Sequence, residues 1–144
     1  EWENPAPWVM RGFPGKIRQL VWSDHAIANG APLLATASAE GVVIWERHKE
    51  EAIGWEGRVL GSHDGIVSDI RFQPNSTLLA SAGEDGWIVL WRKATEICQT
   101  LNGAPEGFSC LAWHPQGIYL AAGGQQGELR VWSQASRGQG FGKR

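Results

Sequence analysis

"LLASAGEDGWIVLW", residues 78–91, reads as two short apolar strands joined by a turn. The turn contains Asp85-Gly86, a dipeptide typical of tight β-hairpins. Two further stretches, "LLATASAEGVVIW" (33–45) and "LAAGGQQGELRVW" (120–132), share this pattern and also end in a tryptophan. Three copies of one hairpin in a chain of 144 residues predict an internal repeat, and such a repeat determines the fold.

The repeat extends upstream of each hairpin. A second apolar segment, which itself ends in an aromatic residue, precedes the three copies at 17–22, 66–72 and 108–113. A third apolar segment comes before it: "PWVM" (7–10), "GRVL" (57–60) and "EICQTL" (96–101). Each unit therefore has four short strands once the leading segment of its neighbour is counted. No helical period is sustained for the roughly ten residues that a helix needs, so we expect an all-β fold.

This repeat resembles that of the WD-repeat β-propeller family, which has a period of about 40 to 45 residues and four strands per unit. Residues 60–91 carry nearly the whole pattern, and 101–132 follow them position by position. The resemblance implies β-propeller blades of four antiparallel strands, three WD-type blades in this chain. We expect blade 1 at about 11–60, blade 2 at about 61–101 and blade 3 at about 102–132, with blade 3 completed by an N-terminal strand at 7–10.

The resemblance also explains the polar residues inside the apolar stretch. WD-repeat propellers contain a buried hydrogen-bond network of a His, a Ser or Thr, an Asp and a Trp. These roles fall here on His63, Ser81, Asp85 and Trp91. Burying any of these groups without a partner would cost several kcal/mol, so they should occur as a set or not at all.

The other two copies fit that logic. In the third copy the equivalent residues are Ala104, Ala122, Gln126 and Trp132, so the His and the Ser are lost together. In the first copy Phe13 replaces the His and Thr36 replaces the Ser. Ser81, His63 and Asp85 could also be taken for a catalytic triad, but the sequence shows neither an oxyanion loop nor a nucleophile elbow. We therefore predict no catalytic residue and no enzyme activity.

The composition argues against some classes of binding partner and favours one cellular compartment. A net charge of −2 argues against a nucleic-acid partner, which requires an excess of Lys and Arg. No apolar run approaches the roughly 20 residues that cross a bilayer, and no signal peptide is visible, so we expect no membrane partner. Two cysteines without a framework fit a reducing, cytoplasmic location. The four histidines show no metal-ligand spacing, so we expect no metal and no cofactor.

Three blades are too few for a closed ring, because propellers generally have four to eight. Two explanations stay open. The chain is a half-propeller that forms a homodimer of three plus three blades, or it is part of a longer, bacterial-type WD-repeat protein with six to eight blades. In the dimer, Pro7 to Met10 would add to the blade that ends at Trp132 of the partner.

The resemblance implies a non-enzymatic scaffold that binds protein or peptide partners through loops around the central channel. By repeat position these loops contain Lys16, Arg18, Asp64, Ile66, Ser68, Glu84, Gly107, Ser109 and Gln125. Trp87 replaces a small residue nearby and either packs between blades or anchors a partner. The alternative function is an enzyme or metal-handling protein with its site in the channel, which would need convergent carboxylates or histidines there.

Overall fold

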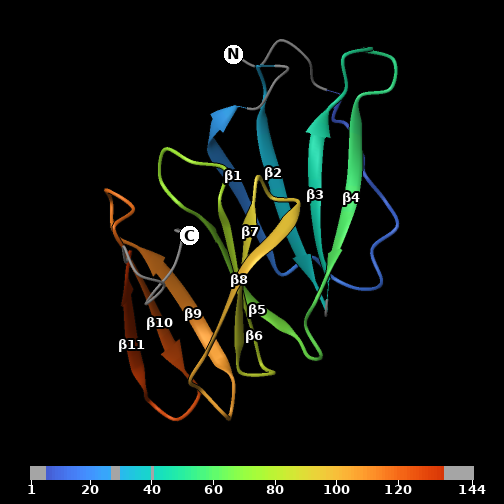
Figure 1. Ribbon diagram of the computed structural model, residues 1–144. Coiled ribbons are helices and arrows are strands. Elements are labelled where there is room, and N and C mark those ends of the chain that lie inside the picture. The colour runs from blue at the N-terminus through green and yellow to red at the C-terminus, as the bar shows by residue number, and fades with distance from the viewer. Residues whose placement is uncertain (1–5, 27–29, 40, 135–144) are drawn as a thin grey trace.

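The computed structural model of the chain describes residues 6–26, 30–39 and 41–134, which form three antiparallel sheets (Figure 1). Every regular element in these ranges is a strand, which confirms the all-β fold class. Each sheet contains one copy of the repeat, as expected of WD-type blades. We call the sheets blade 1, blade 2 and blade 3 in chain order. Across these ranges the three blades form an open row rather than a closed ring.

Blades 1 and 2 have four strands each, arranged in the order of the sequence. Blade 1 consists of β1 (Gln19–Ala26), β2 (Pro32–Ser38), β3 (Gly41–Arg47) and β4 (Trp55–Gly61). Blade 2 consists of β5 (Val67–Phe72), β6 (Leu79–Gly83), β7 (Trp87–Arg92) and β8 (Glu96–Asn102). Blade 3 has three strands within the described residues: β9 (Phe108–Trp113), β10 (Tyr119–Gly124) and β11 (Leu129–Ser133).

The central hairpin is formed by β6 and β7, whose turn contains Gly86. Gly86 has a φ of 85°, in the left-handed region that disfavours residues with a side chain. A Cβ atom at this position would lie 2.5 Å from the carbonyl oxygen of Ala104, in the loop before blade 3. The Asp-Gly turn therefore reverses the chain and also lets blade 3 approach closely.

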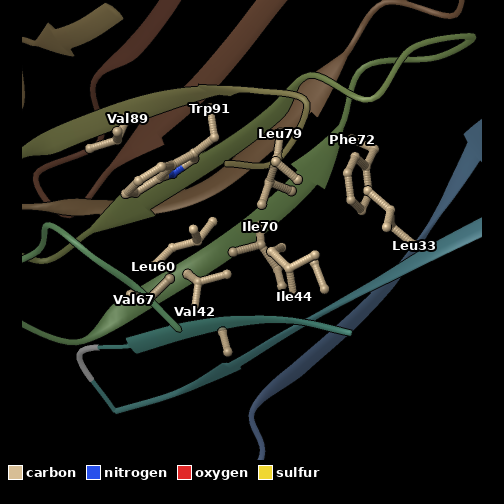
Figure 2. Packing of buried hydrophobic residues seen from close by; sticks show 13 residues of the cluster. Leu33, Val42, Ile44, Leu60, Val67, Ile70, Phe72, Leu79, Val89 and Trp91 are labelled. Atoms are coloured by element: carbon tan, nitrogen blue, oxygen red, sulfur yellow. The ribbon is translucent and has the colours of Figure 1, made fainter. Parts of the chain in front are cut away.

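The hydrophobic core has two layers, one on each side of blade 2. The first layer lies between blades 1 and 2, where Ile44 and Leu60 meet Ile70 and Trp91 (Figure 2). The second lies between blades 2 and 3 and is centred on Phe108. Because blade 2 is covered on both faces, all five residues of β6 are buried. This double coverage explains the almost continuous apolar character of the stretch that contains the hairpin.

Residues 7–10 precede blade 1 and are not part of a strand. The ring of Trp8 lies against Gly54, and the guanidinium carbon of Arg47 is 5.0 Å from the ring centroid. The first contact is with the connection between β3 and β4, and the second is with the last residue of β3. The addition of this segment to the third blade of a partner stays a prediction.

Candidate partner-binding face

Seven of the nine predicted binding residues lie in loops that meet at one end of the blades, and the other two, Ser68 and Ser109, are the second residues of β5 and β9. The backbone N–H of Glu84, in the turn after β6, donates to the carbonyl oxygen of Ile66, in the loop before β5, over 2.9 Å. The N–H of Gln125 makes the equivalent 2.9 Å bond to Gly107 in blade 3. In blade 1 the N–H of Arg18 donates to Ala37 over 2.8 Å. We call this end of the three blades the loop face.

The nine predicted residues differ in how much they expose to a partner. Six have exposed side chains: Lys16, Arg18, Asp64, Glu84, Ser109 and Gln125. Ile66 and Ser68 are half-buried, and Gly107 is buried. Gly107 has a φ of 99°, and a Cβ atom on it would lie 2.8 Å from the Cα of Glu84. Its role is therefore to let the two loops approach each other, and it offers no contact surface.

Ser68 joins neighbouring blades. Its hydroxyl oxygen lies 2.5 Å from the carbonyl oxygen of Phe108 in blade 3, to which it donates. Its carbonyl oxygen accepts the side-chain amide of Gln19 in blade 1 over 3.3 Å. The strands β1, β5 and β9 thus lie along the inner edge of the row, and the loops before them form the centre of the loop face.

Directly beneath the loop face, hydrogen bonds connect the four residues of the expected network. The indole N–H of Trp91 donates to Oγ of Ser81 over 2.9 Å, and the same Oγ is 2.9 Å from Nε2 of His63. Nδ1 of His63 lies 3.0 Å from Oδ2 of Asp85. Because the Ser81 oxygen already accepts from Trp91, its proton is available for Nε2. In the tautomer that carries its proton on Nδ1, His63 donates to Asp85 and its Nε2 accepts from Ser81.

Asp85 ties this network to the loop face. Its carboxylate accepts the backbone N–H of Asp64 over 3.0 Å and that of Trp87 over 3.1 Å. It therefore holds the loop before β5 and the turn after β6 in one arrangement. The Ser-His-Asp connectivity matches that of a catalytic triad, but Ser81 is fully buried and its oxygen is occupied by Trp91. No substrate can reach that oxygen, so the arrangement supports a structural role.

The other blades replace the network in two ways. In blade 1 the indole N–H of Trp45 donates to Oγ1 of Thr36 over 3.1 Å, and the ring of Phe13 lies 5.7 Å from that of Trp45. In blade 3 Ala122 is buried, and the ring of Trp132 meets that of Phe108 edge-on at 6.2 Å. The His position is thus filled by an aromatic ring or lost together with its Ser partner.

Asp69 is a structural residue that the sequence analysis missed. Its buried carboxylate accepts the backbone N–H of Leu111 in blade 3 over 2.7 Å and that of Ile70 over 3.0 Å. The guanidinium of Arg71 lies 3.3 Å away. The signal in the sequence was a carboxylate inside the apolar segment "IVSDIRF", which requires buried partners.

The structure also locates the side chains that could bind a metal ion, the two thiols and Trp87. Among the residues that the structure describes, no three His, Cys, Asp or Glu side chains converge on a point where a metal ion could bind. Cys98 and Cys110 are free thiols. Trp87 is 43 % exposed, beside the turn that contains Asp85. In the same part of the chain, no helix is present that could span a bilayer.

Comparison with known proteins gave matches of two kinds. The family model WD40, described as "WD domain, G-beta repeat", matches residues 54–92 and 95–133. The human protein Atg16l2 is 35 % identical to this chain over 77 residues, which is 51 % of the chain. The chain covers only 12 % of the length of that relative.

Proposed function

This chain belongs to the WD40 repeat family, and from that premise we propose that it is a non-enzymatic scaffold that holds a protein or peptide partner against its loop face. WD40 repeats are characteristic of protein-interaction domains. The residues that we propose for contact are Lys16, Arg18, Asp64, Ile66, Ser68, Glu84, Ser109 and Gln125. The alternative of an enzyme or metal-handling protein has no support from the groups on this face.

The observation that supports the proposal is that the loop face exposes side chains while the network beneath it holds backbone groups by hydrogen bonds. In blade 2 the network fixes the backbone at Asp64 and Trp87 through Asp85, so the exposed side chain of Asp64 stands on a rigid base. A rigid base reduces the entropy that is lost when a partner binds. The sign of the exposed charges changes along the row, from positive at Lys16 and Arg18 before β1 to negative at Asp64 and Glu84 in blade 2. A partner that carries both acidic and basic residues fits this order.

A peptide array tests the proposal and does not require the partner to be identified first. The wild-type chain is incubated with an array of synthetic peptides of varied charge, and the bound spots are compared with those of Arg18→Glu. We expect Arg18→Glu to lose the peptides with acidic residues and to keep its melting temperature, because an exposed charge contributes little to folding.

Lys49→Glu is the matched control. Lys49 is also an exposed cation of blade 1, but it lies in the connection between β3 and β4, away from the loop face. Its peptide pattern should match that of the wild type. The proposal fails if the wild-type chain binds no peptide, or if Lys49→Glu and Arg18→Glu lose the same peptides. If Arg18→Glu unfolds the chain, the residue is structural and the face is misplaced.

We also propose a cytoplasmic location. The support is chemical: an exposed thiol such as Cys110 persists in its reduced form in a reducing compartment.

A further inference from the structure

Trp87 is a tryptophan on the loop face that the packing of the blades leaves exposed. It is the first residue of β7 and follows the turn after β6. Val89 and Trp91 lie two and four residues further on, hence on the same face of the strand, and both are buried against blade 1 (Figure 2). Trp87 is 43 % exposed, although it continues this buried row. Blades 1 and 3 have Gly41 and Glu128 at the same place in the repeat, so the aromatic ring is particular to blade 2.

One carboxylate holds Trp87 next to Asp64. Oδ1 of Asp85 accepts the backbone N–H of Trp87 over 3.1 Å, and Oδ2 of the same residue accepts that of Asp64 over 3.0 Å. Asp85 is itself held by His63 beneath the loop face. An exposed aromatic residue and an exposed carboxylate therefore lie side by side. The backbone at both residues is in place before a partner arrives, which lowers the entropic cost of binding.

Two glycines bring further carboxylates to the same place. A Cβ atom on Gly65, the neighbour of Asp64, would lie 3.7 Å from the Cβ of Glu84. A Cβ atom on Gly107, the neighbour of Glu106, would lie 2.8 Å from the Cα of Glu84. The loops before β5, after β6 and before β9 thus meet at Glu84, and each exposes one carboxylate: Asp64, Glu84 and Glu106. We call Trp87 and these three carboxylates the acidic surface.

The acidic surface has no cation of its own among the residues that the structure describes. Its three loops contain neither Lys nor Arg. Arg130 reaches the edge of the loop before β9, where its Nε donates to the carbonyl oxygen of Gly103 over 2.6 Å. Within the described part of the chain, the three carboxylates form no ion pair and no side-chain hydrogen bond. Like charges held close together repel one another, so a cation from outside is attracted to this surface.

We propose that the acidic surface binds an arginine or lysine side chain of the partner, an inference that rests on the proposed function of the loop face. A cation placed over the exposed indole of Trp87 is attracted by the negative face of the ring, and the neighbouring carboxylates balance its charge. Arginine fits best, because its flat guanidinium stacks on the ring and donates to a carboxylate at the same time. Basic residues of the partner then lie over blade 2, and its acidic residues lie near Lys16 and Arg18 before β1.

A pair of matched peptides tests this inference on the wild-type chain. Both are short, fluorescently labelled peptides of neutral residues; one carries a pair of arginines, and the other carries citrulline at the same places. Citrulline keeps the length and the planar donor group of arginine but has no charge. We expect the arginine peptide to bind about three- to tenfold more tightly in fluorescence anisotropy, and this preference to shrink as salt is added.

Substitutions on the acidic surface show whether the preference arises there. Trp87→Ala should abolish it, whereas Trp87→Phe should keep part of it, because a smaller ring still attracts a cation. Glu106→Gln should weaken binding of the arginine peptide and leave binding of the citrulline peptide unchanged. Glu51→Gln is the matched control. It removes the same charge from the connection between β3 and β4, away from the loop face, and should keep the preference of the wild type.

Equal affinity of the wild-type chain for the two peptides overturns the inference, and so does a preference that Trp87→Ala and Glu106→Gln both retain. In either case the proposed function still stands if other peptides of the array bind at the loop face. If no peptide of any charge binds the wild-type chain, the proposed function fails and the inference fails with it. The comparison of the two peptides needs no variant, so it holds even if Trp87→Ala unfolds, and Glu106→Gln then locates the site.

Discussion

Ser81 serves two buried partners with a single hydroxyl group. It accepts from Trp91 and donates to His63, and both partners are shielded from water. Thr36, at the same place in blade 1, has only Trp45 as a side-chain partner, because Phe13 stands where the histidine would be. The Thr36 hydroxyl donates instead to the backbone carbonyl oxygen of Val43 over 3.2 Å. The two hydroxyl groups thus occupy equivalent positions in the repeat, but Ser81 bonds two buried side chains and Thr36 bonds one.

We therefore expect Ser81→Ala to lower the free energy of unfolding by more than Thr36→Ala does. Ser81→Ala leaves two buried side-chain groups without this partner, at a cost of about 1–3 kcal/mol for each, whereas Thr36→Ala leaves one side-chain group and a backbone carbonyl that lies within a sheet. Urea denaturation of both variants measures the difference. Equal losses, or a larger loss for Thr36→Ala, would mean that the His63 contact adds nothing to stability.

Trp87 allows a prediction about binding. Its large side chain is 43 % exposed next to the network, so replacing it should remove little packing energy. We expect Trp87→Ala to weaken peptide binding at the loop face and to leave the urea midpoint almost unchanged. Ile97→Ala, which removes a comparably exposed side chain from the same blade, should leave binding unchanged. A large drop in the urea midpoint of Trp87→Ala would instead assign Trp87 to packing between blades.

At the scale of the element, the turn between the second and third strands has the same backbone conformation in blades 2 and 3 but different neighbouring atoms. Gly86 and Gly127 occupy the same place in blades 2 and 3, with φ of 85° and 83°. A Cβ atom on Gly86 would lie 2.5 Å from the carbonyl oxygen of Ala104, whereas one on Gly127 would have no neighbour within 4 Å. Comparing the two glycines therefore distinguishes the energetic cost of the backbone conformation from the energetic cost of the close contact between blades.

Replacing each glycine with alanine should show that separation. Gly127→Ala should cost about 1–2 kcal/mol, the strain of a left-handed residue. Gly86→Ala should cost clearly more, because the loop at Ala104 must also move. Thermal unfolding of the two variants provides the comparison. If both lose the same stability, the blades are free to shift apart at this turn.

The strands could be predicted from sequence, whereas the contacts between loops could not. The spacing of Trp45, Trp91 and Trp132 gives three hairpins, because apolar runs and turn residues are local signals. The burial of Gly107 depends on Glu84, which is distant in the sequence, and the role of Asp69 depends on Leu111 in another blade. Such partners depend on how the blades pack, and the repeat pattern of a single blade carries no information about that.

At the scale of the whole molecule, blade 1 exposes Leu20 and Trp22, and blade 3 exposes Leu129 and Val131. Burying even ~400 Å² of apolar surface at each contact would contribute about 10 kcal/mol. That is comparable with the roughly 5–15 kcal/mol of a typical domain. Chains that expose these residues should therefore associate or aggregate in solution.

The homodimer expected from the sequence makes a prediction about segment 7–10, which would complete blade 3 of a second copy next to β11. Deleting residues 1–10 removes that strand and exposes the backbone edge of β11. We expect the shortened chain to lose the mass of a dimer in light scattering or to aggregate. Deleting residues 135–144, a stretch without an apolar run, is the control, and the chain without them should keep the mass of a dimer. A stable dimer of the shortened chain would contradict the addition of this segment to the partner. Segment 7–10 would then have no part in completing blade 3.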